Sequence, residues 1–420
     1  MAIIKPFKGL RPPKNKVEEV ACLPYDVMNS KEAAKMVDGK EASLLRITRA
    51  EVEFNNEEGI DSHDEKVYSK AKENFKKFQE KGFLVQDTDA HYYIYAQTMN
   101  GKTQYGIVGD AACEDYLNGK IKKHELTRPD KEEDRKILTR HLEANIEPVF
   151  FTYRAVPEID AIVSSIVINN APEYDFTSED GFGHHFWIIK DAVTNKTIEH
   201  LFNEKVPYTY VADGHHRTAA AASMSKEFSR KNPNHTGNEP YNYFMAVHFP
   251  DTQLQIIDYN RVVKDLNGLN TAEFLKKINE NFGITQVSES VLKPEKLHDF
   301  SMYLDGKWYG LSANKPTYND DNPIDSLDVS VLSKYILEPI LNIKDLRTDT
   351  RIDFVGGIRG LKELSKRVDV GEMAVAFALF PVSMNQLMHI ADTGNIMPPK
   401  VTWFEPKLRS GLVINKLNDY

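Results

Sequence analysis

The run Asp213-Gly214-His215-His216-Arg217 contains the residue types that point most directly to chemistry. It follows the β-rich residues 208–212 and precedes an alanine-rich stretch typical of a helix. Glycine at such a junction permits a tight turn and lets a ligand approach the backbone. Unpaired amides at a helix N-terminus favour an anion, and histidine and arginine add donors and positive charge. The run therefore favours a phosphate-binding site over an ordinary surface helix start.

Asp213, the first residue of this run, and Thr218, which follows it, belong to the same candidate site. Asp213 ends the predicted strand, where a carboxylate can accept a proton, hold a metal ion or merely cap the helix. Thr218 follows the arginine and joins the predicted phosphate-binding residues Gly214 to Arg217. We predict a catalytic role for Asp213, and we assign no residue of the sequence as a metal ligand.

A second candidate segment begins at His124-Glu125-Leu126-Thr127-Arg128 and mixes carboxylates with cations. It is too irregular for a helix before Pro129, whereas residues from 131 onward can be helical. Charged runs of this kind are usually solvated helices. By itself, the segment favours that structural interpretation over a functional one.

Two proline-containing segments leave structural and functional interpretations open. Residues 397–411 carry Lys400, Thr402 and Lys407 and either present cations to an anion or pack over the core. Leu23-Pro24-Tyr25-Asp26 is either a rigid turn or a loop on the substrate side.

Helices and strands alternate irregularly around these segments. The sequence predicts helices over residues 30–36, 61–81, 131 onward, 158–169, 218–231, 272–282, 329–337 and 386–393. It predicts strands over residues 91–97, 105–110, 150–153, 185–190, 208–212, 243–249, 255–263 and 374–380, and a hairpin over 301–311. This order favours a mixed α/β (α+β) fold. The length of 420 residues suits two domains, which we expect at 1–255 and 256–420.

Composition excludes several classes of protein. The net charge of −9 argues against non-specific binding to nucleic acid or to an anionic membrane. The sequence contains no apolar run long enough to span a bilayer, no leader-like start and only two cysteines, so we expect a cytoplasmic protein. The P-loop, dinucleotide-binding glycine, zinc-protease and nucleophile-elbow motifs are also absent from the sequence.

The Asp213-Gly-His-His-Arg run, preceded by His124-Glu125, resembles the free L-serine kinases of the ParB/sulfiredoxin-like superfamily. The larger pattern is similar to the family catalogued as conserved domain of unknown function 1015. Its further hallmarks are Pro24-Tyr25-Asp26-Val27, Thr127, Asp134-Arg135 and Met397-Pro-Pro-Lys400. The resemblance implies a ParB/sulfiredoxin-like core with an N-terminal extension and a C-terminal α/β domain that closes the site.

The resemblance also implies an activity, the phosphorylation of free L-serine to O-phospho-L-serine. Glu125 would contact the serine hydroxyl and act as the base, Asp213 would be essential, and the residues after it would hold the donor phosphates. We expect magnesium as cofactor and favour pyrophosphate over ADP or ATP as donor. The candidate substrate-binding residues are His124, Thr127, Arg128, Arg135, Lys400 and Arg46.

The alternative function is a ParB-like nucleotide-dependent DNA-binding or regulatory protein. The acidic net charge and the lack of an arginine-rich arm argue against it. A sulfiredoxin-like reductase is less favoured because neither cysteine is near Asp213 in the sequence. We therefore expect serine and a phosphoryl donor as partners, without nucleic acid or membrane, and leave the oligomeric state open.

Overall fold

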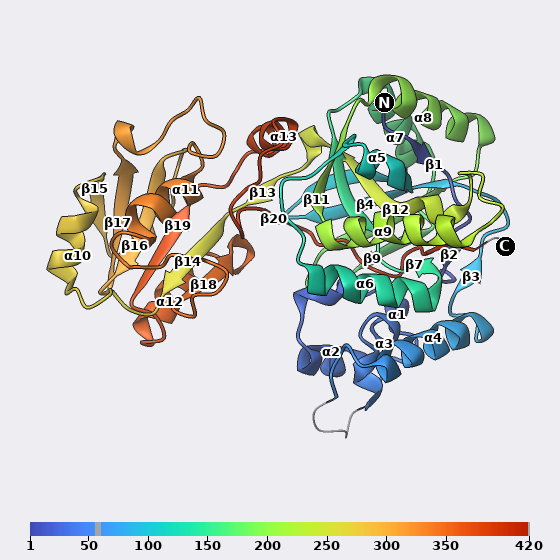
Figure 1. Ribbon diagram of the computed structural model, residues 1–420, viewed down its shortest axis with the longest axis horizontal. Coiled ribbons are helices and arrows are strands. Elements are labelled where there is room, and N and C mark those ends of the chain that lie inside the picture. Colours follow the sequence, from blue (N-terminus) through green and yellow to red (C-terminus); the bar gives the residue numbers. More distant parts are fainter. Residues whose placement is uncertain (55–59, 419–420) are drawn as a thin grey trace. The chain divides into compact units, whose positions relative to one another are not determined.

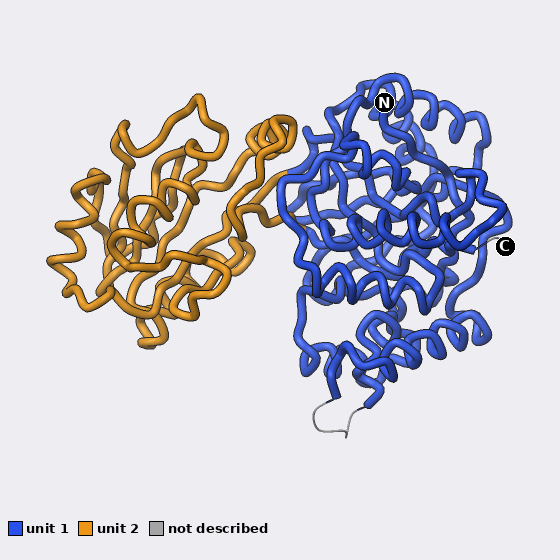
Figure 2. The backbone as a smooth tube through the Cα atoms, in the orientation of Figure 1, with its two compact units in different colours: residues 1–254, 406–420 blue, residues 255–405 orange. Residues whose placement is uncertain are grey.

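The computed structural model describes residues 1–54 and 60–418, and the chain forms two compact units. The first unit combines Met1–Leu254 with the segment from Pro406 onward, and Gln255–Glu405 forms the second (Figure 2). Both units mix helices with sheets, so the predicted mixed α/β fold class is confirmed. The division into functional domains at residue 255 stays a prediction.

The first unit is built from short and long strands with helices between them (Figure 1). Its strands are β1 (Ile4–Lys5), β2 (Leu10–Arg11), β3 (Val85–Gln86), β4 (Tyr92–Met99), β5 (Lys102–Ala112), β6 (Ile121–Lys122), β7 (Ala144–Asn145), β8 (Val149–Tyr153), β9 (Tyr174–Thr177), β10 (Gly183–Ile189), β11 (Thr209–Asp213), β12 (Tyr243–Pro250) and β21 (Asn415–Lys416). Its helices are α1 (Val17–Val20), α2 (Ser30–Val37), α3 (Leu45–Thr48), α4 (Glu65–Glu80), α5 (Cys113–Leu117), α6 (Pro129–Leu142), α7 (Pro157–Asn169), α8 (Ala192–Lys205) and α9 (His215–Lys231).

The central sheet of this unit has the strand order β6-β11-β8-β12-β5-β4-β10-β9, and β1 also pairs with β5. Most neighbours are antiparallel, but β11 pairs with β6, and β12 with β8, in parallel. The parallel pairs matter for the site because parallel strands end at the same edge of a sheet.

The two faces of the sheet are covered in different ways. Ile107 and Phe151 lie on a face packed against helices, in apolar clusters that include Phe202 of α8 and Ala222 of α9. The opposite face is covered in part by the end of the chain. There, the Arg409 backbone N–H donates to the Tyr95 hydroxyl oxygen (3.2 Å), and Asn415 donates to the buried Asp110 carboxylate (2.8 Å).

An N-terminal helical layer packs against α6, which itself runs beside α9 (Figure 1). The predicted helix over 61–81 is α4, and it buries one apolar face that contains Val67, Ala71, Phe75 and Phe78. That face, with residues of α1, α2, α3 and α6, forms one apolar cluster. The layer thus supports the helix that follows the His124-Glu125 segment.

The second unit contains a separate sheet with the order β15-β17-β16-β19-β14-β18. Its strands are β13 (Ile256–Ile257), β14 (Tyr259–Val263), β15 (Phe282–Ser288), β16 (Asp299–Leu304), β17 (Lys307–Ala313), β18 (Ile352–Gly356), β19 (Val375–Leu379) and β20 (Trp403–Phe404). Its helices are α10 (Thr271–Ile278), α11 (Asp328–Leu332), α12 (Leu361–Asp369) and α13 (Met384–Asp392). The helix predicted over 272–282 ends at Ile278, because Phe282 already begins β15.

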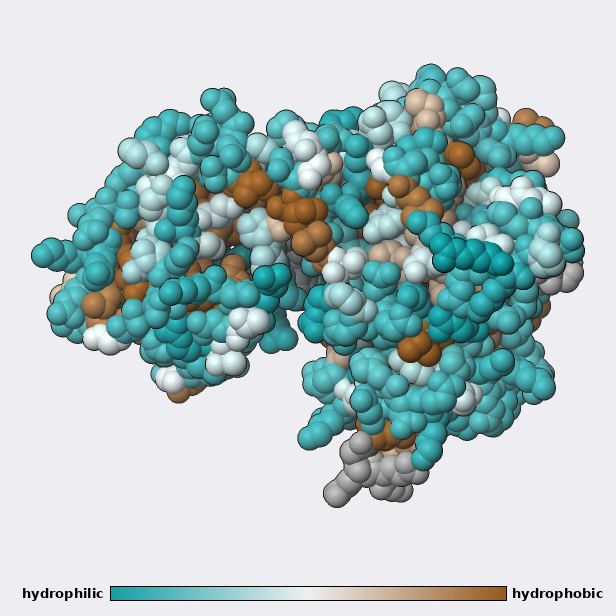
Figure 3. Space-filling view, in the orientation of Figure 1, coloured by the Kyte–Doolittle hydropathy of each residue, from teal (hydrophilic) through white to brown (hydrophobic). Residues whose placement is uncertain are grey.

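The surface agrees with the charged composition of the sequence. The face of each unit visible in Figure 3 is mainly hydrophilic, with scattered apolar side chains. Among the described residues, every helix is too short or too polar to cross a bilayer.

Helix α8, which the sequence did not predict, offers a test of the packing. We expect Phe202→Ala to lower the free energy of unfolding by about 3–5 kcal/mol, because the side chain is fully buried and its ring packs 5.0 Å from that of Tyr153. Val193→Ala on the same helix should change it by less than about 0.5 kcal/mol, since Val193 is 71% exposed. Urea denaturation measures both, and equal effects would contradict this packing.

Candidate active site

The junction between β11 and α9 carries the histidine-arginine run. Gly214 has a φ of +94°, in the left-handed region that favours glycine. The Thr218 hydroxyl donates to the Gly214 carbonyl (3.0 Å) and fixes the turn. Helix α9 begins at His215, earlier than the predicted start at Thr218. His215, His216 and Arg217 therefore form the first turn, whose amides have no partner within the helix.

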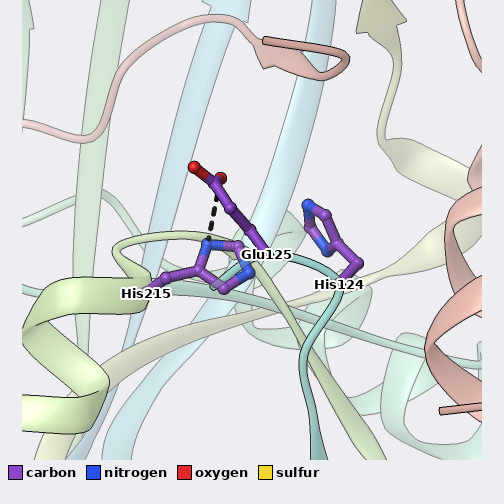
Figure 4. A group of neighbouring side chains, drawn as sticks. All are labelled: His124, Glu125 and His215. Atoms are coloured by element: carbon purple, nitrogen blue, oxygen red, sulfur yellow. Dashed lines mark ion pairs between the residues drawn. The ribbon is translucent and has the colours of Figure 1, made fainter. Parts of the chain in front are cut away.

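Parallel pairing of β6 with β11 brings the second candidate segment to this junction. Ile121 lies opposite Thr209, and both strands end at the same edge of the sheet. The ring centroids of His124 and His215 are consequently 4.6 Å apart, with the rings perpendicular. The Glu125 carboxylate lies 3.8 Å from Nδ1 of His215 (Figure 4). The two motifs, far apart in sequence, thus meet in one cluster.

The histidines of this cluster are neutral at physiological pH. Burial lowers the pKa of His124 to about 4, although the charge of Asp213 opposes the shift. Burial also lowers the pKa of His215 well below its usual value, and nearby His124 adds to that effect. Burial likewise lowers the pKa of half-buried His216, whose Nε2 accepts a hydrogen bond from the Arg128 backbone N–H (3.1 Å).

Asp213 is held by partners on both carboxylate oxygens. Oδ1 accepts from the Gly214 backbone N–H (2.8 Å), and Oδ2 pairs with Nζ of Lys407 (2.9 Å). Burial acts to raise the pKa of this carboxyl, but the charges of Lys407 and Arg217 outweigh it and hold the pKa well below its usual value. Asp213 is therefore ionised at physiological pH.

Arg217 of the first turn of α9 and the buried Arg135 of α6 line the same pocket. Arg217 donates through Nη1 to the Pro148 carbonyl, and the Arg135 guanidinium stacks over the Tyr25 ring at 3.7 Å. Nη1 of Arg135 lies 3.8 Å from the Glu147 carboxylate. Burial raises the pKa of Glu147, although both arginine charges oppose this shift.

These charged groups line an open pocket, whose space of about 410 Å³ includes solvent at its mouth. It is bordered by α6, α9, β8 and β12, and its lining residues are Arg135, Leu138, Thr139, Asn145, Ile146, Glu147, Val149, Arg217, Ala220, Ala221, Phe244 and Met245. Arginine can bind a carboxylate or a phosphate bidentately, so a pocket lined by two arginines suits a small anion.

Other predicted substrate residues are engaged elsewhere or at the rim. Arg46 donates to the Val37 and Lys40 carbonyls and pairs with Glu53, all within the N-terminal helical layer. The exposed Arg128 guanidinium pairs with Asp130 (2.8 Å). The roles of Arg46 and Arg128 in substrate binding stay predictions.

Two further predicted residues differ in their surroundings. The Thr127 hydroxyl donates to Glu132 (3.3 Å) at the start of α6. Lys400 belongs to the second unit, where its Nζ lies 5.7 Å from the centroid of the Tyr259 ring. Their contributions to substrate binding also stay predictions.

Glu147 is a charged residue of the pocket that the sequence did not single out. Its carboxylate accepts from the Tyr25 backbone N–H (3.1 Å) and the Ser410 hydroxyl (3.0 Å). The one feature of the sequence that could have drawn attention to Glu147 is its position as an acidic residue directly before Pro148 and the buried strand β8.

Gly214 can be tested against a glycine with nearly the same backbone angle. We expect Gly214→Ala and Gly237→Ala each to lower the free energy of unfolding by about 1–2 kcal/mol, because both φ values exceed +90°. Only at Gly214 would the new Cβ lie 3.2 Å from the Arg217 guanidinium, whereas the space at Gly237 is open. Binding of inorganic phosphate, measured by calorimetry, should therefore weaken only in Gly214→Ala. Equal phosphate binding by both variants would contradict the proposed cradle.

Several solved structures are distantly similar to this chain. A free serine kinase in complex with AMP shares 11% identity at a TM-score of 0.37, covering 73% of this chain and 91% of that one. SbnI with a C-terminal truncation, from Staphylococcus aureus, shares 11% identity at a TM-score of 0.36, covering 73% and 85%. A conserved hypothetical protein from Pyrococcus furiosus shares 13% identity at a TM-score of 0.32, covering 71% and 90%.

The family assignment comes from the sequence as a whole. No curated protein matches the chain. The family model described as protein of unknown function DUF1015 matches residues 4–330, which is most of the chain and includes both motifs of the candidate site. The chain belongs to the DUF1015 family.

Proposed function

We propose that the protein is a phosphotransferase that phosphorylates the hydroxyl of free L-serine to give O-phospho-L-serine. The observation that carries this proposal is the meeting of Glu125 with the first turn of α9. A carboxylate beside a cationic helix N-terminus provides a base for an alcohol and a cradle for phosphate. Phosphoryl transfer depends mainly on such positioning and charge neutralisation.

Glu125 acts on the acceptor. Its side chain is 47% exposed, so a small substrate can reach the carboxylate. The serine hydroxyl oxygen attacks the donor phosphorus while Glu125 takes the hydroxyl proton. The bond between that phosphorus and the leaving phosphate oxygen breaks, and its electron pair leaves with the phosphate. With pyrophosphate as donor, the products are O-phosphoserine and orthophosphate.

The first turn of α9 acts on the donor. Its backbone amides, His216 and Arg217 bind the phosphate oxygens, and Thr218 fixes the turn through Gly214. Ionised Asp213 offers the kind of oxygen ligand that magnesium prefers, and magnesium would neutralise the charge of the donor phosphates. We propose pyrophosphate as the donor, ahead of ADP and ATP, on the family resemblance of the motifs.

The arginine-lined pocket suits the ends of the amino acid. A serine carboxylate can pair with Arg135, whose Nη1 is buried without a hydrogen-bond partner among the described residues. The nearby Glu147 carboxylate can accept from the serine ammonium group. Both groups flank Arg217, so serine and donor phosphate would bind side by side.

The direct test is a product assay on the full chain. Protein is incubated with L-serine, magnesium and either pyrophosphate, ADP or ATP, and phosphoserine is quantified by mass spectrometry. We expect phosphoserine with pyrophosphate. Formation of phosphoserine only with ADP or ATP would contradict pyrophosphate as the donor. The absence of phosphoserine with all three donors would contradict the proposed kinase activity.

Two isosteric substitutions test the assigned roles. We expect Glu125→Gln and Asp213→Asn each to slow transfer by at least about 10²-fold, because one removes the base and the other an anion that orders the cradle. Glu133→Gln is the matched control, since that carboxylate lies on α6, is half exposed and pairs with Lys136. Initial rates and melting temperatures should be measured together. A fully active Asp213→Asn protein would show that the role of this residue is wrong.

A further inference from the structure

His124, Glu125 and His215 form a cluster that the proposed transfer uses only in part. One nitrogen or carboxylate oxygen from each residue lies within 4.8 Å of the corresponding atoms of the other two. Figure 4 shows the Glu125 carboxylate beside the His215 ring and the His124 ring facing the same space. Among the described residues, these three side chains form the group whose potential metal-ligand atoms lie this close to one another.

The two histidines are buried with unsatisfied nitrogens. His124 is 2% exposed and His215 is 7% exposed. Within the described part of the chain, Nδ1 and Nε2 of His124 and Nε2 of His215 have no hydrogen-bond partner. A buried polar group left unpaired costs about 1–3 kcal/mol, so several such atoms at one point call for a ligand.

The chemistry of the three side chains selects the kind of ligand. Imidazole nitrogens and a carboxylate oxygen are common metal ligands, and here they converge at one point where histidine nitrogens lack hydrogen-bond partners among the described residues. Two imidazoles with one carboxylate suit zinc and neighbouring transition metals, whereas magnesium prefers oxygen ligands.

We propose that His124, Glu125 and His215 bind a divalent transition-metal ion of the zinc type. Metal–nitrogen bonds of about 2.1 Å place two ligands of one ion about 3–4 Å apart, so the cluster contracts slightly on binding. The half-exposed Glu125 carboxylate already lies 3.8 Å from Nδ1 of His215. With protein ligands on the buried side, a coordination position stays open toward solvent for a water or a substrate oxygen.

This site goes beyond the proposed kinase, because binding of the ion requires neither serine nor a phosphoryl donor. It would also be distinct from the magnesium that accompanies the donor phosphates. A cation held here would stabilise a deprotonated oxygen beside Glu125, the point at which the acceptor hydroxyl is proposed to bind.

The test is a metal titration of the full chain without substrates. Protein treated with a chelator and dialysed is titrated with Zn²⁺, Mn²⁺ and Mg²⁺ by calorimetry. We expect one Zn²⁺ per chain, bound at least about 10²-fold more tightly than Mg²⁺. Zn²⁺ binding should weaken at least about tenfold in His124→Gln, His215→Gln and Glu125→Gln. His200→Gln is the control for loss of a histidine, because His200 is exposed on α8.

Substitution of a buried histidine can impair folding. Two further measurements therefore test the site without any histidine variant. Glu125 is half exposed, and folded Glu125→Gln that binds Zn²⁺ as tightly as the unchanged chain would overturn the proposal. Co²⁺ bound to the unchanged chain should give visible absorption bands that Zn²⁺ abolishes. The weak spectrum of hydrated Co²⁺, or Mg²⁺ binding as tight as Zn²⁺ binding, would also overturn it. Phosphoserine assays do not enter these titrations, so the two proposals fail separately.

Discussion

The parallel pairing of β6 with β11 is the constraint on which the rest of the candidate site depends. It involves only Ile121 and Lys122 against Thr209 and Tyr210, yet it joins segments separated in sequence by the sheet strands β8, β9 and β10. A parallel pair needs a long crossover, and here the crossover contains the strands and helices that build the core. The edge at which both strands end therefore brings the two motifs together.

Electrostatics at this edge follow from burial. The site combines ionised Asp213 with Lys407, and Glu147 with two arginines, in surroundings where each charge requires a partner. The neutral side chains of His124 and His215 lie near Asp213. A small anion or a cation can enter such a site because the fixed charges are already paired and oriented, and ordering them costs little when a ligand binds.

Local patterns made some parts of the structure predictable. Val67, Ala71, Phe75 and Phe78 recur at helical spacing and are all buried on α4, so that helix could be read from the sequence. The strand-glycine-helix junction at Gly214 was predictable because a β-rich run, a glycine and an alanine-rich run follow one another in the sequence. Helix α8 was not, because its polar sequence includes several β-branched residues and buries only a narrow stripe at Asn195, Ile198 and Phe202. The predicted start of helix α9 at Thr218 was too late, because the high helix propensity of the alanine run does not extend to the residues of the first turn.

The remaining parts of the site depend on contacts distant in sequence. Nothing near Glu147 in the sequence indicates that Arg135 and Arg217 will flank it. Lys407 was one of several cations in a segment with two open interpretations, and only the fold pairs it with Asp213. The orphaned nitrogens of His124 likewise arise from tertiary burial, which residue types alone do not reveal.

The segment from Pro406 onward has a consequence for how the chain acquires its structure during synthesis. The first unit lacks Lys407, Arg409 and Asn415 until the second unit has been synthesised, because these residues follow Gln255–Glu405 in the sequence. Until then one face of the central sheet is partly bare, and the Asp213 carboxylate has no lysine beside it. The site is thus completed only after the second unit has been synthesised, so a chain truncated before Pro406 carries both motifs in sequence without the finished arrangement around them.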